Sequence, residues 1–236
     1  GASASLYAGG VDADQGGIYN TAGITTVGGA VTMRGQFIHG EGEIRTNGGA
    51  VDLFATGMIS HQGLIQTSGG AVLLRGAQGV QDSESSYGVY ETQVDAGAGS
   101  ITVQSGTGIY GGSYTTTGNT SFTAQDGSIY LYDVHAAQVA LQASGGIYAS
   151  LDATQRVDAA TTEGSVSLSS AGTGVLPLGN VSSPGSVSLN SSSGITMAAD
   201  GLIRAQYLLV DLDGSTGSAG TAAAPLRVAS YASETP

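Results

Sequence analysis

The feature that most constrains this chain is an internal repeat. The tetrad Gly-Gly-Ala-Val begins at residues 28, 48 and 69, so successive copies lie 20 and then 21 residues apart. A fixed period of this length is typical of solenoid proteins, in which every repeat contributes one structural unit. Four further registers match across the three copies: Ile18, Ile38 and Ile59; Ile24, Ile44 and Ile65; Thr26, Thr46 and Thr67; Met33, Leu53 and Leu74.

Within each unit, the apolar residues lie two positions apart or are separated by glycine, as in Val31 with Met33 and Val51 with Leu53. A spacing of two indicates β-strands, because alternate side chains of a strand share a face. A single unit is too small to bury its own core, whereas stacked units pair each strand with its counterpart about 4.8 Å away. We therefore expect an all-β fold, a single-stranded right-handed parallel β-helix (solenoid) with coils of about 20 residues and short loop insertions.

We expect one β-helix domain over residues 1–236 and interpret the chain as a fragment of a larger protein. In the alignment of the repeats, Val80 takes the place of Ile59 and Val94 that of Ile65, which leaves a polar insertion between them. The domain then divides into four parts: regular coils at 18–76, a loop insertion near 82–93, degenerate coils at 94–229 and a polar tail at 230–236.

Composition agrees with a narrow, repetitive interior and excludes several classes of partner. The chain has 40 glycines, 3 phenylalanines and no tryptophan, so small aliphatic side chains have to fill the core. Its mean hydropathy of +0.11 and charged fraction of 10% argue against disorder. With a net charge of −12 and only six basic residues, it lacks the clustered cations that nucleic acid requires. No apolar run approaches the length of about 18 residues that membrane insertion needs.

The coil motifs resemble those of a known family. The alternation of Gly-Gly-Ala-Val-x-Met/Leu with Ile-x-Thr-x-Gly-Gly is similar to the coils of filamentous haemagglutinin-like exoproteins, large adhesins of the two-partner secretion type. The segment 219–228, AGTAAAPLRV, also resembles a pattern of that family, I-G-T-A-x-N-P-L-x-V. Here Ala219 replaces the isoleucine and Ala224 the asparagine.

The resemblance implies a structural or adhesive segment of a secreted protein on the bacterial cell surface, which mediates attachment or forms a stiff fibre. It implies as partners a glycan or protein of a host or neighbouring cell, and an outer-membrane protein that serves secretion. The chain itself shows no counterpart of the family's N-terminal secretion domain.

Tyrosines supply the strongest candidate binding residues, because seven of the eleven lie within residues 87–148. If Ile129 and Leu131 point inward, strand alternation places Tyr130 and Tyr132 on the outer face. Tyr110, Tyr130 and Tyr148 are about one coil apart, so we expect an exposed aromatic ladder suited to sugar rings or a partner protein. The alternative is cross-strand packing without binding. The candidate residues are Tyr110, Tyr114, Tyr130, Tyr132 and Tyr148.

Paired carboxylates are the weaker candidates for a catalytic or metal site. Three pairs occupy alternate positions: Asp12 and Asp14, Glu41 and Glu43, and Asp211 and Asp213. Their spacing is compatible with acid/base work on glycosides, but no nearby histidine or basic cluster would tune their pKa. Asp211 and Asp213 begin like a calcium loop but lack its later acidic ligand; they are the calcium candidates, and we expect no other cofactor.

Two further functions remain open at this stage. A β-helical polysaccharide lyase or glycoside hydrolase would gather acidic and basic side chains from successive coils, and the arginines are thinly spread. An ice-binding or other repeat-surface protein would need a regular threonine ladder, for which 115–117 is the one hint. We expect no enzymatic activity.

Charged and histidine side chains of the regular coils are expected on the surface. His39 and His61 lie 22 residues apart, and we expect both to face solvent. Arg34 and Arg75 occupy equivalent positions with Asp52 between them, which predicts a surface charge ladder.

Overall fold

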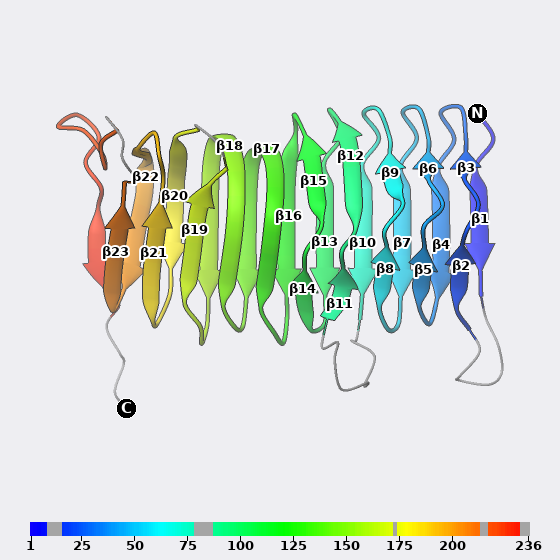
Figure 1. Ribbon diagram of the computed structural model, residues 1–236, viewed down its shortest axis with the longest axis horizontal. Coiled ribbons are helices and arrows are strands. Elements are labelled where there is room, and N and C mark those ends of the chain that lie inside the picture. The colour runs from blue at the N-terminus through cyan, green and yellow to red at the C-terminus, as the bar shows by residue number, and fades with distance from the viewer. Residues whose placement is uncertain (9–15, 78–86, 172–173, 213–216, 232–236) are drawn as a thin grey trace.

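The fold is a rod of stacked coils. The computed structural model describes residues 1–8, 16–77, 87–171, 174–212 and 217–231, whose regular secondary structure is entirely β-strand. The strands form one sheet, and their pairings are parallel. Figure 1 shows the strands of successive coils side by side, with the N-terminal coils at one end of the rod and the C-terminal strands at the other. The predicted all-β parallel solenoid is confirmed.

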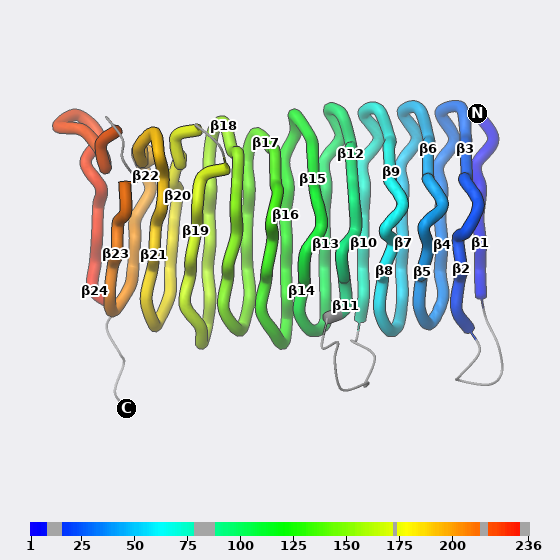
Figure 2. The backbone as a smooth tube through the Cα atoms, in the orientation of Figure 1, coloured from blue at the N-terminus to red at the C-terminus, as the bar shows by residue number. Residues whose placement is uncertain are grey.

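The winding is right-handed. In the view of Figure 1 the chain advances from right to left, the strands nearest the viewer point upward, and the strands behind them point downward. The tube in Figure 2 shows that the chain reverses direction in a tight bend at both long edges of the rod.

The strands fall into three stacks, which we number in chain order within a coil. The first stack contains β2 (Ile18–Asn20), β5 (Ile38–Gly40), β8 (Ile59–His61), β11 (Tyr87–Tyr90), β14 (Gly108–Tyr110), β19 (Val166–Ser170), β21 (Ser186–Asn190) and β23 (Tyr207–Asp211). The second contains β3 (Ile24–Thr25), β6 (Ile44–Arg45), β9 (Leu64–Gln66), β12 (Gln93–Gly97) and β15 (Ser113–Thr116). The third contains β1 (Ala4–Tyr7), β4 (Val31–Gly35), β7 (Val51–Ala55), β10 (Val72–Gly76), β13 (Ile101–Ser105), β16 (Asn119–Ala124) and β24 (Val228–Ser230).

Four longer strands link these stacks. β17 (Ile129–Ala143) and β18 (Ile147–Thr161) turn through all three, and their mutual pairing shifts register at the bends. β20 (Leu176–Ser182) and β22 (Ile195–Ala205) pair with each other, and their final residues extend the third stack. The apolar run 202–210 is divided between β22 and β23.

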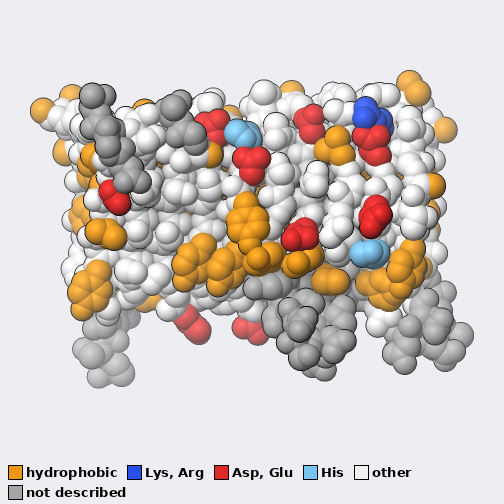
Figure 3. Space-filling model, in the orientation of Figure 1, with side chains coloured by type: hydrophobic (Ala, Val, Ile, Leu, Met, Phe, Trp, Pro, Cys, Tyr) orange, Lys and Arg blue, Asp and Glu red, His pale blue; other side chains and the backbone are white. Residues whose placement is uncertain are grey.

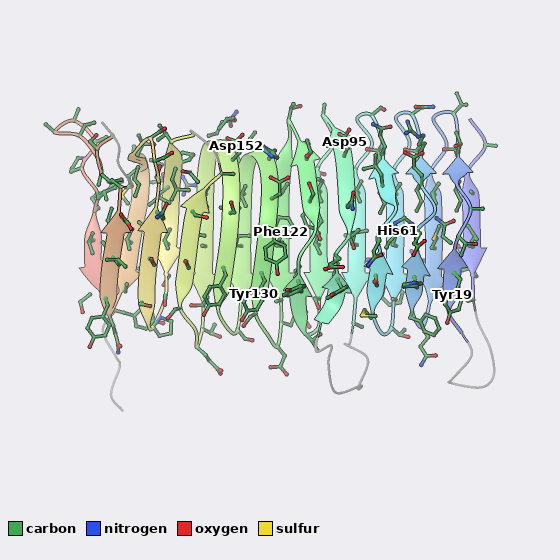
Figure 4. The ribbon with its side chains drawn as sticks, in the orientation of Figure 1. Tyr19, His61, Asp95, Phe122, Tyr130 and Asp152 are labelled. Carbon is green, nitrogen blue, oxygen red and sulfur yellow. The ribbon has the colours of Figure 1, made fainter. Side chains whose placement is uncertain are left out.

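The core consists of ladders of like residues. In the first stack, isoleucine or valine of successive coils pairs in register at the inward position, at Ile18, Ile38, Ile59, Val89, Ile109, Ile129, Ile147, Val166 and Val187. These side chains are buried, as is Phe122 of the third stack, labelled in Figure 4. Burying one such side chain stabilises the fold by about 1.5–3 kcal/mol.

Buried threonines close the corners of the regular coils. The hydroxyls of Thr26, Thr46 and Thr67 each donate to the carbonyl three residues later, in the sequence Thr-x-Gly-Gly. The second glycine of the motif allows close stacking, because a Cβ on Gly49 would lie 2.1 Å from the carbonyl oxygen of Gly29 in the preceding coil. The repeated threonine and glycine registers therefore satisfy the backbone groups of a buried corner.

One register of the repeat alignment was wrong. Val89, not Val80, pairs with Ile59, whereas Val94 pairs with Ile65 as predicted. β11 therefore occupies the second half of the expected insertion at 82–93, and the described coil resumes at residue 87. Residues 82–86 lie outside the described part of the chain, as do residues 232–236 of the expected polar tail.

The prediction for His61 was also wrong, while His39 is exposed as expected. His61 is completely buried, and burial lowers the pKa of its imidazole. Its Nδ1 lies 2.8 Å from the carbonyl oxygen of Gly63, so this nitrogen donates, and Nε2 accepts from the Asn20 amide at 3.1 Å. Gly40 stands between Asn20 and His61 in the stack and leaves room for this contact.

Candidate functional site

Four tyrosines occupy one outward register of the first stack on successive coils. Tyr90 pairs with Tyr110, Tyr110 with Tyr130, and Tyr130 with Tyr148. Each follows a buried Val89, Ile109, Ile129 or Ile147, so strand alternation directs it away from the core. We call these four residues, together with Tyr132, whose ring contacts that of Tyr110, the tyrosine ladder. Figure 3 shows hydrophobic side chains gathered in a band along this edge of the rod, and Figure 4 marks Tyr130 on the same edge.

The rings of the ladder contact one another directly. Tyr90 stacks on Tyr110 with ring centroids 5.4 Å apart, and Tyr130 stacks on Tyr148 at 4.9 Å with an interplanar angle of 7°. Tyr110 and Tyr130 are tilted at 5.9 Å, and Tyr132 meets the edge of Tyr110 at 5.5 Å. These contacts hold the rings in defined orientations, so little side-chain freedom is left for a ligand to remove.

The ladder is partly open to solvent. Tyr132 is 55% exposed and Tyr148 43% exposed, while Tyr90, Tyr110 and Tyr130 are half-buried. An aromatic surface of this kind offers apolar ring atoms together with phenolic hydroxyls. It can therefore pack against the apolar side of a sugar and also form hydrogen bonds with it.

The structure brings together four of the five predicted residues, Tyr110, Tyr130, Tyr132 and Tyr148. Their outward orientation and their ladder are confirmed. Tyr90 is a member that the sequence analysis missed, because the misplaced insertion obscured the alternation of Val89 with Tyr90.

Tyr114 was wrongly predicted as a surface residue. It is completely buried, pairs in register with Val94 and Val134, and packs edge-on against Phe122 at 4.9 Å. Burial raises the pKa of its phenol well above the ordinary range. Its hydroxyl has no hydrogen-bond partner among the described residues. Tyr114 is therefore part of the core and does not form the binding surface.

A hollow of about 530 Å³ lies beside the ladder. Tyr132 forms an aromatic wall, and the remaining lining combines one carboxylate with amides, a hydroxyl and bare backbone: Gln62, Glu91, Gln93, Gly112 and Ser113. The hollow therefore combines an aromatic face with several polar groups, as many small-ligand sites do.

The predicted carboxylate pairs give no comparable site within the described residues. Glu43 pairs with Arg45, and this hydrogen bond holds the pKa of the Glu43 carboxyl below its usual value, opposite to what a general acid needs. Asp211 is exposed at the end of β23, while Asp12, Asp14 and Asp213 lie outside the described residues. Over the described ranges, no three His, Asp or Glu side chains are arranged to hold a metal ion.

One histidine of the second stack is flanked by carboxylates. His135 Nε2 lies 2.8 Å from Asp133, and Nδ1 lies 3.0 Å from Asp152 on the next coil. The hydroxyl of Ser113 donates to Asp133 at 3.0 Å rather than to the imidazole. Ser113 and His135 therefore form no serine–histidine pair, and the cluster links adjacent coils.

Comparisons of this chain with protein-family models, with curated proteins and with solved structures give no match. Within the described ranges, no helix has the length and apolar character that a membrane-spanning segment requires. Function therefore has to be inferred from the geometry of the tyrosine ladder and the hollow beside it.

Proposed function

We propose that this chain is a stiff adhesive segment that binds glycans through its tyrosine ladder. The observation that carries the proposal is the ladder itself, in which Tyr90, Tyr110, Tyr130 and Tyr148 contact one another along successive coils. Partly exposed aromatic rings that touch in a row are suited to the repeated, ring-shaped units of an oligosaccharide, which presents apolar C–H faces at regular intervals.

The rod supports this role because its stacked coils hold the ladder in a fixed position. The first and third strand stacks run along the length of the molecule, and the in-register aliphatic ladders fill the space between the stacks. Each coil is thus held by its two neighbours. A rigid aromatic surface loses less conformational entropy on binding than a mobile loop would.

The wider setting is part of the same proposal. The resemblance of the coil motif and of the segment 219–228 to filamentous haemagglutinin-like exoproteins supports a secreted protein on the bacterial cell surface. It also supports export with an outer-membrane partner of the two-partner type, and attachment to a host or neighbouring cell.

The test replaces Tyr110, Tyr130 and Tyr132 by serine together. We expect binding to immobilised oligosaccharides or to glycan-bearing cells to fall by about tenfold or more, because three aromatic contacts are lost. The circular dichroism spectrum should remain that of the wild type, since the core ladders are untouched.

The matched control replaces three exposed tyrosines outside the ladder by serine, namely Tyr7, Tyr19 and Tyr207, which are 69%, 66% and 74% exposed. This variant should bind like the wild type. Undiminished binding by the ladder variant, or an equal loss in the control, would refute the proposal.

A further inference from the structure

We infer that the hollow between Glu91 and Tyr132 is a sugar subsite that prefers amino sugars over neutral sugars and disfavours acidic ones. The inference rests on the proposed glycan binding by the tyrosine ladder and adds the chemical class of the ligand. It is carried by the backbone conformation of Glu91, by the glycines that open the hollow, and by the charge of the lining.

Glu91 and Tyr132 converge on one bare stretch of backbone. A Cβ built on Gly111 would lie 3.0 Å from Cγ of Glu91 and 3.6 Å from Cε2 of Tyr132. Gly111 and the next residue, Gly112, both have positive φ, at +71° and +90°. Any side chain at Gly112 would collide with the carbonyl oxygen of Thr92, 2.5 Å away. The glycine pair therefore keeps the space between the carboxylate and the aromatic wall open.

Glu91 adopts an unfavourable conformation to reach this position. Its φ is +44°, in the left-handed region that glycine tolerates better than any other residue. The next coil has glycine at the position equivalent to Glu91, because Tyr90 pairs with Tyr110 and the residue after Tyr110 is Gly111. Strain of this kind is concentrated at binding and active sites. The coil thus carries a carboxylate at a turn where glycine would be the less strained residue.

No ion pair within the described residues involves Glu91. Its Oε2 accepts a hydrogen bond from the amide of Gln62 at 3.2 Å, and its side chain is half-buried. A carboxylate held in this way can accept a charge-assisted hydrogen bond from an incoming ammonium group.

The lining of the hollow explains the order of preference. It contains one carboxylate, two glutamine amides and one serine hydroxyl, and no cationic side chain. The amides and the hydroxyl can bind the hydroxyl groups of any sugar, while the ring of Tyr132 packs on its apolar face. The carboxylate adds attraction for an ammonium group and repulsion for a uronate, and the net charge of −12 strengthens this discrimination.

The experiment compares three oligosaccharides of equal length by calorimetry: glucosamine, N-acetylglucosamine and galacturonate oligomers. The wild type should bind the glucosamine oligomer about tenfold more tightly than the N-acetylated one, since a hydrogen bond to a charged group is gained. It should bind the galacturonate oligomer most weakly. Glu91→Gln should abolish the preference for glucosamine and retain the binding of N-acetylglucosamine.

Two further variants separate this site from general electrostatic attraction and from misfolding. Glu163→Gln removes an exposed carboxylate outside the hollow and should keep the full preference. Glu91→Gly relieves the left-handed strain, so it should lose the preference while its thermal unfolding midpoint stays equal to or above that of the wild type.

The outcomes separate failure of the amino-sugar subsite from failure of the proposed glycan binding. If Tyr132→Ser weakens all three ligands but Glu91→Gln leaves the glucosamine preference intact, glycan binding by the ladder stands and the amino-sugar subsite is refuted. An equal loss of preference in Glu163→Gln would also refute the subsite. If the wild type binds none of the three oligomers, the proposed function fails, and this inference fails with it.

Discussion

The regular coils at 18–76 and the middle coils at 87–161 share one interior but have different exteriors. Both stack parallel strands in the same three stacks, and both fill the inward positions with in-register aliphatics. On the outer face, the first region carries arginines around Phe54, whereas the second carries the tyrosine ladder. The interior fixes the period of the coil, and the exterior is free to acquire function.

The charged side chains on the outer face of the regular coils lie on the third stack, whereas the ladder lies on the first. Arg34 and Arg75 lie over the ring of Phe54, with guanidinium carbons 5.7 and 5.4 Å from its centroid. Both also pair with Asp52 at 2.9 Å, which confirms the predicted charge ladder. Because both guanidinium groups already pair with the Asp52 carboxylate, this surface offers less to a partner than the ladder does.

The largest expected effect tests whether the two regions share one core. Leu53 and Phe122 belong to the same inward ladder of the third stack, and both are fully buried. Leu53→Ala should lower the free energy of unfolding by about 2–5 kcal/mol and Phe122→Ala by about 3–5 kcal/mol, because each leaves a cavity. Urea denaturation measures both. A loss under about 1 kcal/mol in either region would show that its coils are not packed around this ladder.

A second prediction concerns a buried group of the middle coils. Tyr114→Phe should raise the free energy of unfolding by about 1 kcal/mol, since the buried hydroxyl has no partner among the described residues and the ring contact with Phe122 is kept. Tyr148→Phe, on the outer face, should change stability by less than about 0.5 kcal/mol. The same denaturation curves measure both variants, and destabilisation by Tyr114→Phe would contradict the burial described for it.

The regular coils should show a pH dependence of stability that originates from His61. Because burial lowers its pKa below 6.5 in the folded state, the unfolded chain binds the proton more readily. Stability is therefore greatest above pH 6.5 and falls as the pH decreases towards the folded-state pKa, by up to about 1.4 kcal/mol per pH unit. Chemical denaturation across this window should show the slope in the wild type and in His39→Gln. A slope that persists in His61→Gln would assign it to another group.

The smallest effect concerns the charged exterior of the regular coils. Asp52→Asn should lower the free energy of unfolding by about 1 kcal/mol or less, because its two ion pairs are partly exposed. The difference from the wild type should shrink at high salt, where such pairs are screened. An effect above about 2 kcal/mol, or one independent of salt, would mean that this surface is a structural element of the core.

The sequence predicted the fold well where one signal repeats. Ile38 and Ile59 recur with the coil period, and Tyr130 and Tyr148 take their outward position from the neighbouring isoleucines. Tyr114 was misassigned because it follows Gly111 and Gly112, whose left-handed backbone resets the alternation of inward and outward side chains.

Two other features depend on contacts between coils. His61 is buried because strand alternation from Ile59 directs it inward, where Gly40 leaves space for its bond to Asn20. The hollow beside the ladder is formed by Glu91 and Tyr132, which lie on different coils. No local pattern in the sequence predicts that these two side chains lie close together.

The most direct test of the central claim observes every tyrosine in one sample. With tyrosines selectively labelled on the ring, an NMR titration with the N-acetylglucosamine oligomer follows each ring as the ligand is added. The account predicts shifts of Tyr110, Tyr130, Tyr132 and their neighbours in the ladder, and no shift of Tyr19 in the regular coils. Shifts confined to Tyr19 and the tyrosines at the rod ends, or no shift of any ring, would contradict it.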